Sequence, residues 1–241
     1  MDTVEAYSPA TNRWVSLPPL ARARAWMAGA TAPCPAGVTG LTGTCVYALG
    51  GADALNLSAS VNTVEAYSPA TNRWVTLRSL PTDHGAPAGA AGPCPHAVLS
   101  QQQTCVYVAG GSPGPAELDE NHRKVAAYYP GANVWATLPS LPTIRQGLAG
   151  AAAPCPARPA ETCFYAVGGE DGVALDTVES YNSVDNVWST LPPLPTARLN
   201  LAAATAPCPA NLNRTCVYAI GGKQAFGGDP VPTVEAFDVE R

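Results

Sequence analysis

Eight cysteines, arranged in four pairs, are the residues whose type and spacing most directly predict chemistry in this 241-residue chain. In each pair the first cysteine stands between two prolines and the second follows a threonine. The pairs are Cys34 with Cys45, Cys94 with Cys105, Cys155 with Cys163, and Cys208 with Cys216. Thiols at such spacing can oxidise to disulfides or, as thiolates, bind a metal ion. The outcome depends on the elements that bring the two cysteines of a pair together.

Side chains suited to acid–base or nucleophilic catalysis show no comparable order. The three histidines lie in different predicted loops, and the sequence contains neither a Gly-X-Ser-X-Gly nor a His-Glu-X-X-His motif. Acidic residues on variable segments are more simply interpreted as solvated than as paired for catalysis: Asp119, Glu120, Glu170 and Asp171. We therefore expect no enzymatic activity, no cofactor and no catalytic or metal-binding residue.

Internal repetition supplies the framework for these residues. The segment TVEAYSPATNRWV occupies positions 3–15 and recurs unchanged at 63–75. Weaker copies begin at Lys124 and Thr177, and a partial copy begins at Thr233. The repeat is about 53 to 61 residues long and fills positions 1–241. We therefore predict one domain built of repeats.

Each repeat contains four short runs typical of β-strands, and no helical period. The first run is mostly Ala and Gly, and the second is continuously apolar, as in TCVYALGG. An apolar run without polar alternation predicts a strand buried on both faces. Two further runs, NTVEAYS and RWVTL, flank a turn with Pro and Asn. Sheets buried on both faces need a similar sheet on each side, which predicts a β-propeller with the Ala- and Gly-rich strands at its crowded axis.

The repeated positions resemble the kelch repeat, in which an apolar strand ends in Gly-Gly and is followed by a Tyr and a Trp seven residues apart. The glycine pairs are Gly50 with Gly51, Gly110 with Gly111, Gly168 with Gly169, and Gly221 with Gly222. The aromatic pairs, which we expect to be structural parts of the blades, are Tyr7 with Trp14, Tyr67 with Trp74, Tyr128 with Trp135, and Tyr181 with Trp188. The resemblance covers essentially the whole chain. The Asp that usually follows the Tyr is replaced by Ser8, Ser68, Tyr129 and Asn182.

The glycine pairs are expected to permit positive φ and close chain approach. A phosphate-binding loop is the alternative interpretation, but no helix follows them.

Counting strands 1 to 4 in each repeat gives 17, which is four blades' worth of sequence plus one extra strand. Three arrangements remain open. The N-terminal pair of strands could complete the C-terminal blade in a closed four-blade ring, the chain could be part of a larger ring, or the open blades could pair with another copy head to tail.

The predicted hairpins place the two cysteines of each pair on neighbouring ends of strands 1 and 2. Cβ atoms there lie about 4.5–5.5 Å apart, near disulfide range. We predict four disulfides rather than zinc binding, because the pair spacing and the scarcity of histidine do not resemble a zinc site. Disulfides imply an oxidising compartment, so we expect a secreted or cell-surface protein. Asn56 and Asn213 begin glycosylation sequons in predicted loops.

The segments after strands 2 and 4 of each repeat should share one face, which we call the loop face. Its segments vary most between repeats, and kelch-like domains often use this face for partners. A basic residue precedes each inner strand there: Arg24, His84, Arg145 and Arg198. A ring of these side chains could bind an acidic peptide or carboxylate. The alternative, which we favour, is that each supports its own loop through backbone carbonyls.

Composition narrows the function further. The net charge of −5 argues against nucleic acid as the main partner, and no stretch is long and apolar enough to span a membrane. We expect a secreted or cell-surface module that binds a protein or peptide through the loop face without catalysis. The first alternative is a structural subunit that assembles head to tail. The second is a lectin or a carbohydrate-active enzyme. Kelch-like oxidases use a copper-bound Tyr cross-linked to Cys, but here every Cys has a structural assignment.

Overall fold

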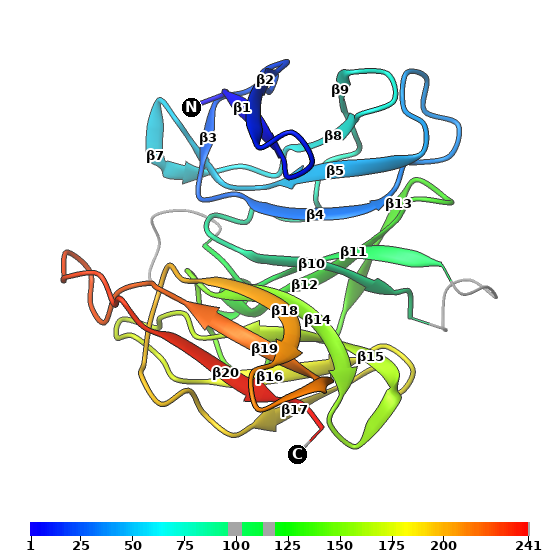
Figure 1. Cartoon of the computed structure of the whole chain (residues 1–241). Coiled ribbons are helices and arrows are strands. Elements are labelled where there is room, and N and C mark those ends of the chain that lie inside the picture. Colours follow the sequence, from blue (N-terminus) through cyan, green and yellow to red (C-terminus); the bar gives the residue numbers. More distant parts are fainter. Residues whose placement is uncertain (96–102, 113–118, 241) are drawn as a thin grey trace.

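The computed structural model describes residues 1–95, 103–112 and 119–240. Its antiparallel sheets follow one another along the chain in the manner of propeller blades (Figure 1). The 17 blade strands expected from the sequence are all present, in the expected order. The all-β propeller architecture is therefore confirmed.

Three blades contain four strands each. The first blade comprises β4 (Ala28–Pro33), β5 (Thr44–Leu49), β8 (Val64–Ser68) and β9 (Arg73–Thr76). The second blade comprises β10 (Ala88–Pro93), β11 (Thr104–Ala109), β12 (Val125–Tyr129) and β13 (Val134–Leu138). The third blade comprises β14 (Ala149–Cys155), β15 (Arg158–Val167), β16 (Val178–Asn182) and β17 (Val187–Leu191).

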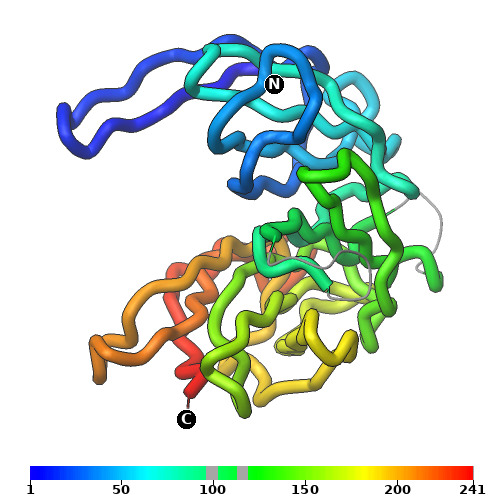
Figure 2. The backbone as a smooth tube through the Cα atoms, turned by 90° about the vertical axis from the view of Figure 1, so that its right-hand side faces the viewer, coloured from blue at the N-terminus to red at the C-terminus, as the bar shows by residue number. Residues whose placement is uncertain are grey.

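Two sheets are incomplete and lie at the ends of the arc. The last blade has three strands, β18 (Ala202–Cys208), β19 (Asn211–Ile220) and β20 (Val234–Asp238). The N-terminal hairpin, β1 (Val4–Ser8) and β2 (Arg13–Leu17), forms a sheet of its own. Figure 2 shows the dark blue hairpin and the orange last blade on opposite sides of an opening. A closed four-blade ring, one of the three arrangements left open, is therefore not formed in the described part of the chain.

The inner strands pack as closely as their small residues allow. A Cβ added at Gly150 of β14 would lie 2.7 Å from the carbonyl oxygen of Gly89 in β10. A Cβ added at Gly89 would lie 2.8 Å from the Cβ of Ala28 in β4. Contacts this short exclude larger side chains. The Ala- and Gly-rich runs are thus explained by the crowding of inner strands.

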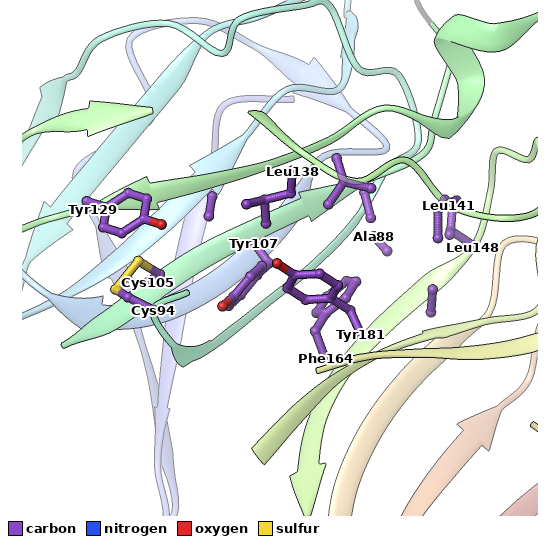
Figure 3. Close-up of a cluster of buried hydrophobic side chains, with 14 residues drawn as sticks. Ala88, Cys94, Cys105, Tyr107, Tyr129, Leu138, Leu141, Leu148, Phe164 and Tyr181 are labelled. Atoms are coloured by element: carbon purple, nitrogen blue, oxygen red, sulfur yellow. A yellow bond between two sulfur atoms is a disulfide. The ribbon is translucent and has the colours of Figure 1, made fainter. Parts of the chain in front are cut away.

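Alternate side chains of a blade strand serve two different cores. In β11, Tyr107 faces the third blade, where its ring stacks on Phe164 with a centroid distance of 5.6 Å (Figure 3). Val106 and Val108 of the same strand face the first blade instead. All three side chains are almost fully buried. This two-sided burial is why the second strand of each repeat lacks polar alternation.

The Tyr and Trp of each complete blade connect strand, turn and neighbouring blade. In the first blade the ring centroids of Tyr67 and Trp74 lie 5.3 Å apart, and the Tyr67 hydroxyl donates to Oδ1 of Asn72 at 2.8 Å. The Trp74 indole N–H donates to the carbonyl oxygen of Pro18, which follows β2, at 2.9 Å. Trp135 and Trp188 make the equivalent bonds to Arg78 and Pro139 at 3.0 and 2.8 Å. The tryptophan therefore links each of these blades to the sheet before it.

Trp14 of the N-terminal hairpin departs from this arrangement. Its ring keeps the contact with Tyr7, at a centroid distance of 5.3 Å, but Trp14 is 67% exposed and Tyr7 is 44% exposed. The physical reason is that, in the described chain, no blade precedes this hairpin and its inner strands are absent from its sheet. We expected Trp14 to be a structural blade residue like Trp74. It makes the expected contact within the hairpin, but in the described chain it does not link the hairpin to another blade, so that part of the expectation is wrong.

The four disulfides join the cysteines as predicted. The bonded pairs are Cys34 with Cys45, Cys94 with Cys105, Cys155 with Cys163, and Cys208 with Cys216. Each closes the hairpin between the first and second strands of its blade, with Cα–Cα distances of 4.9 to 5.0 Å. Closing a loop of this length stabilises a fold by roughly 2.5–3 kcal/mol in the chain-entropy model. The disulfides lie where the first strand of each blade ends and the second begins, which is opposite the loop face.

The burial of the cysteines differs within one pair. Cys45, Cys105, Cys163 and Cys216, which stand on the second strand of each blade, are all buried, with exposed fractions of 0%, 0%, 3% and 3%. Their partners Cys94, Cys155 and Cys208 are buried as well, whereas Cys34 is only partly buried. The disulfides therefore add to the packed interior of the blades as well as closing the hairpin loops.

Several elements on the loop face were not predicted. β3 (Arg24–Ala25), β6 (Ala52–Asp53) and β7 (Asn56–Ser60) form a small sheet of their own. A short 3-10 helix, η1, spans Glu120–Arg123, and Asp119 caps it by accepting from the Asn121 N–H at 2.8 Å. The sequons expected in loops instead begin within strands. Asn56 opens β7 and Asn213 lies in β19, both exposed.

Candidate functional site

The four basic residues expected on the loop face lie inside the blades. The exposed fractions of Arg24, His84, Arg145 and Arg198 are 2%, 1%, 0% and 0%. Side chains buried to this degree cannot form a ring around a channel mouth. The interpretation of these four side chains as ligand contacts is therefore wrong. Their hydrogen-bond partners within the blades explain why they are buried.

Arg145 illustrates the arrangement. Its Nη1 donates to the carbonyl oxygens of Gly168 and Thr177, each at 2.9 Å, and its Nη2 donates to Oε2 of Glu179 at 2.6 Å. Burial lowers the pKa of Arg145, while the nearby Glu179 carboxylate acts in the opposite direction. The arginine thus joins the end of β15 to the start of β16 within its own blade. This is the supporting role that we favoured.

The first and last blades repeat this clamp. Arg24 donates to the carbonyl oxygens of Gly50 and Thr63, both at 2.8 Å, and its Nη2 lies 2.7 Å from Oε2 of Glu65. Arg198 donates to Gly221 and Thr233 at 3.0 and 3.1 Å, and forms an ion pair of 2.7 Å with Glu235. Sequence reasoning missed the three glutamates. The Val-Glu pair in four copies of the repeat, at 4–5, 64–65, 178–179 and 234–235, was the available signal.

The second blade uses a neutral version of the same clamp. His84 Nδ1 lies 2.7 Å from the carbonyl oxygen of Gly110, and Nε2 lies 2.8 Å from the Thr82 hydroxyl. Because a carbonyl can only accept, Nδ1 carries the proton toward Gly110. Burial lowers the pKa of His84 below its usual value. Where this blade has His instead of Arg, Ala126 replaces the glutamate, so the two positions change together.

Four residues in left-handed conformation encircle the axis on the loop face. Trp26, Ala86, Gly147 and Asn200 each stand two residues after a basic residue, with φ between 51° and 61°. The Ala86, Gly147 and Asn200 N–H groups donate to the carbonyl of the preceding member at 3.1, 2.9 and 2.7 Å. These bonds join successive blades near the axis. The residue types differ at every blade, so no sequence pattern indicated them.

A cavity of about 310 Å³ opens among these residues at the centre of the loop face, and we call it the mouth cavity. Residues before the inner strands and after the second strands of all four blades line it. Its apolar rim carries Trp26, Leu57 and Phe226, whose exposed fractions are 54%, 51% and 67%. Its polar wall carries Ser112, Gln146, Glu170 and Asn200. The cavity lies on the face where the sequence predicted a binding site, which stays a prediction, and these particular residues were not predicted.

The acidic residues singled out in the sequence do not come together here. Glu170 is buried at the mouth cavity and its neighbour Asp171 is exposed. Asp119 and Glu120 lie at η1, where Glu120 pairs with Arg123. His122 is buried beside Asp119, and His96 lies outside the described residues. In the described ranges no group of three or more His, Cys, Asp or Glu is placed to hold a metal ion.

Comparison with known proteins decides the family. A family model described as "Kelch motif" matches residues 33–81 and 154–195, which span the Gly-Gly, Tyr and Trp positions of the first and third blades. This chain belongs to the kelch-repeat β-propellers. The kelch pattern also explains the strand order, because the matched positions are those that close each sheet and link it to its neighbour.

Kelch-like relatives and one solved structure agree with this assignment. Human Kelch-like protein 23 is 25% identical over 238 residues, which cover 99% of this chain and 35% of that protein. Mouse Kelch-like protein 35 is 31% identical over 196 residues, covering 80% and 28% respectively. The chain thus spans about a third of the length of these relatives. A structure titled "Structure of YjhT" covers 98% of this chain and 75% of its own, with a TM-score of 0.65 and 15% identity.

The kelch glycine pairs have the backbone role expected of them. The first glycine of each pair has φ between 60° and 65°, and the second between 90° and 107°. A Cβ at Gly50 would lie 2.5 Å from the carbonyl oxygen of His84, and a Cβ at Gly51 would lie 2.6 Å from that of Ala25. Both positions therefore need glycine, for its conformation and for its small size.

Within the described residues, no helix is long and apolar enough to cross a membrane.

Proposed function

We propose that this kelch chain is a non-catalytic binding module that takes a protein or peptide ligand at the mouth cavity. The observation that carries the proposal is the combination of a concave site with exposed anchors, Trp26, Leu57 and Phe226, on the most variable face. Large apolar side chains on a monomer surface mark interaction sites when they surround a cavity. Aromatic residues at such a place commonly provide most of the binding energy.

The absence of catalysis is part of the same proposal. Among the described residues that line the mouth cavity, Glu170 is the one with a carboxyl group, and no His, Cys, Lys or Arg joins it. General acid–base and nucleophilic mechanisms usually need two or more such groups in contact. Glu170 instead accepts hydrogen bonds from neutral donors. This composition favours recognition over chemistry.

We also propose that the protein acts outside the cell or at its surface. Four disulfides in one domain favour an oxidising compartment, because cytosolic proteins rarely keep such bonds. Intact mass after alkylation of the unreduced, unfolded chain from its native source checks this. We expect no alkyl groups to be added. Uptake of alkylating reagent would contradict the proposed location.

Selection of displayed random peptides on the immobilised chain tests the proposed ligand site. We expect enriched peptides to bind at the mouth cavity and to lose at least tenfold in affinity, about 1.4 kcal/mol, on Phe226→Asp. Leu212→Asp is the matched control, because Leu212 is 76% exposed in β19 near the disulfide end of its blade. Selected peptides that respond to Leu212→Asp but not to Phe226→Asp would overturn the proposal.

A second candidate function, head-to-tail self-association, is favoured by the N-terminal hairpin. Residues 3–15 of this hairpin are identical in sequence to residues 63–75 of β8–β9, yet Tyr7 is 44% exposed whereas Tyr67 is 5% exposed. A groove of about 610 Å³ lies between this hairpin and the first blade, with Val4, Leu17 and Met27 in its walls. We propose that β1 takes the place of β20 beside β19 of a second copy, so that β18–β19 of that copy fill the inner-strand positions and its Arg198 faces Glu5 as it now faces Glu235.

Sedimentation velocity over a range of concentrations tests this second candidate. If the chain self-associates, its sedimentation coefficient rises with concentration. The Tyr7→Asp variant should keep the monomer value at every concentration. Phe226→Asp, on the loop face, should leave the association unchanged. A monomer at all concentrations would remove the second candidate and leave the peptide-binding proposal intact.

A further inference from the structure

The mouth cavity contains a buried carboxylate that has no cationic partner. Glu170 is 2% exposed. Its Oε1 accepts from Nε2 of Gln146, and its Oε2 accepts from the Gly172 N–H at 2.8 Å. No Lys, Arg or His lies within ion-pair distance of it in the described part of the chain. A buried carboxylate held only by neutral donors retains a strong affinity for a cation.

The other buried carboxylates of the fold are arranged differently. Glu65 and Glu179 each face a buried arginine at 2.7 and 2.6 Å, inside their own blades. The positions equivalent to Glu170 in the other blades are Ala52, Ser112 and Lys223. The acidic group at this position is therefore not required by the blade architecture. Glu170 makes its side of the mouth cavity acidic, unlike the sides that the described residues of the other blades form.

The rest of the cavity wall suits a cation with a flat apolar face. Trp26 and Phe226 are exposed aromatic rings on the rim, and the described wall contains no basic side chain. Aromatic faces attract cations through their quadrupole, most strongly for Trp. A guanidinium can stack on such a ring while donating two parallel hydrogen bonds to a carboxylate, which an ammonium cannot do.

Resting on the peptide-binding function proposed above, we propose that the mouth cavity recognises an arginine side chain of its ligand through Glu170, with Trp26 at the rim. The guanidinium donates to the free lone pairs of the Glu170 carboxylate. The cavity of about 310 Å³ has room for one such side chain. The expected ligand charge is therefore positive, whereas a ring of basic residues would have bound a negative group. The four basic residues are buried within the blades, and the cavity wall carries a carboxylate instead.

Titration with a short probe tests the assignment. The probe is acetyl-Gly-Arg-Gly-amide, and its control has citrulline, the neutral isostere of arginine, at the same position. We expect the arginine peptide to bind at millimolar concentration in saturation-transfer NMR. The citrulline peptide should bind at least about tenfold more weakly. Equal binding of the two peptides, or no binding of either, would overturn the proposal.

Two variants locate the effect. Glu170→Gln should weaken the arginine peptide at least about tenfold, whereas Asp171→Asn, which removes the same charge from the adjacent exposed residue, should change it less than about twofold. Trp26→Asn should also weaken binding, and it keeps the fold because Asn200 adopts the same left-handed conformation in the last blade. An unchanged affinity of Trp26→Asn and of a folded Glu170→Gln would refute the assignment.

The selection of displayed peptides separates this inference from the function beneath it. If enriched peptides depend on Phe226 but carry no arginine, peptide binding stands and the arginine assignment is wrong. If enriched peptides ignore Phe226, both are wrong. Binding of neutral oligosaccharides at the mouth cavity, with Glu170→Gln weakening them as much as the arginine peptide, would identify a sugar site and also contradict the proposal.

Discussion

At the scale of single residues, the basic positions of this kelch chain support structure rather than ligand binding. An arginine and a glutamate from neighbouring segments meet at the loop end of the first, third and last blades, and His84 and Ala126 stand at these two positions in the second blade. Each buried arginine also satisfies the carbonyl of the first kelch glycine. The glycine pair turns the chain back sharply there, and the clamp holds the turn.

The duplicated segment offers a matched test of the clamp. Glu65 is fully buried against Arg24, while Glu5, in the identical segment of the N-terminal hairpin, is exposed. Glu65→Ala leaves the buried Arg24 charge without its partner, so we expect it to lower the free energy of unfolding by about 3–5 kcal/mol. Glu5→Ala should have little effect. Urea denaturation measures both, and similar effects of the two substitutions would contradict the described burial.

His84 should make stability depend on pH. Its pKa is lowered in the folded state by burial, so below pH about 6.5 the unfolded chain binds a proton that the folded chain does not. Stability should therefore fall on acidification, by up to about 1.4 kcal/mol per pH unit, until the pH reaches the folded pKa. Urea denaturation between neutral and mildly acidic pH measures this slope.

The control for His84 comes from the other blades. The double variant His84→Arg with Ala126→Glu recreates their ion pair, which does not titrate in the same pH range. We expect the slope of stability against pH to flatten in this variant. An unchanged slope would assign the pH dependence to other groups.

At the scale of elements, the sequence predicted strand order, inner strands and disulfides correctly because repetition made each signal recur. Cysteine pairs at both ends of a hairpin loop, such as Cys155 and Cys163, left few alternatives once the hairpin was assigned. Repetition also misled in one place, because Trp14 has the same local sequence as Trp74 but lacks the neighbouring blade that Trp74 contacts. The small sheet β3–β6–β7 and the helix η1 were missed because they lie in segments that differ between repeats. Their conformation depends on contacts made once, which no repeated pattern reveals.

The inner strands provide a matched pair of glycines. Gly150→Ala places a Cβ within 3.0 Å of three backbone atoms of Gly89, so strands β14 and β10 must separate. We expect a loss of about 1–3 kcal/mol of unfolding free energy. Gly29→Ala in β4 meets nothing closer than the Tyr47 carbonyl oxygen at 3.8 Å, and should cost nothing. Thermal or urea unfolding of the two variants compares them, and equal stability would argue against close packing of the inner strands.

The candidate site was predictable only as a face. Strand order placed the variable segments on one side, and the mouth cavity opens there. Phe226 and Leu57 could not be chosen from the sequence, because the loop that holds Phe226 and the strand β7 that holds Leu57 have no counterpart in other repeats. The glutamates of the clamps were available in the repeat itself. In the second blade His84 replaces the arginine and Ala126 replaces the glutamate. This joint replacement would have indicated that the arginine and the glutamate are partners in the other blades.

At the scale of the whole molecule, the blades form an open arc rather than a closed ring (Figure 2). The three cross-blade hydrogen bonds that run from Ala86 to Trp26, Gly147 to Ala86 and Asn200 to Gly147 bring all four inner strands to one mouth. The mouth cavity therefore forms without closure. Ligand binding at the loop face and strand pairing at the open ends use separate surfaces, so each can be tested without disturbing the other.

Hydrogen–deuterium exchange with and without a selected peptide tests the central claim, that ligand binds at the mouth of the loop face. We predict slower exchange in the segments around the cavity: 52–60, 170–176 and 223–230. Exchange at the opposite ends of the blades, in 35–43 and 209–211, should not change. Protection of those opposite segments, with none around the mouth cavity, would contradict the account.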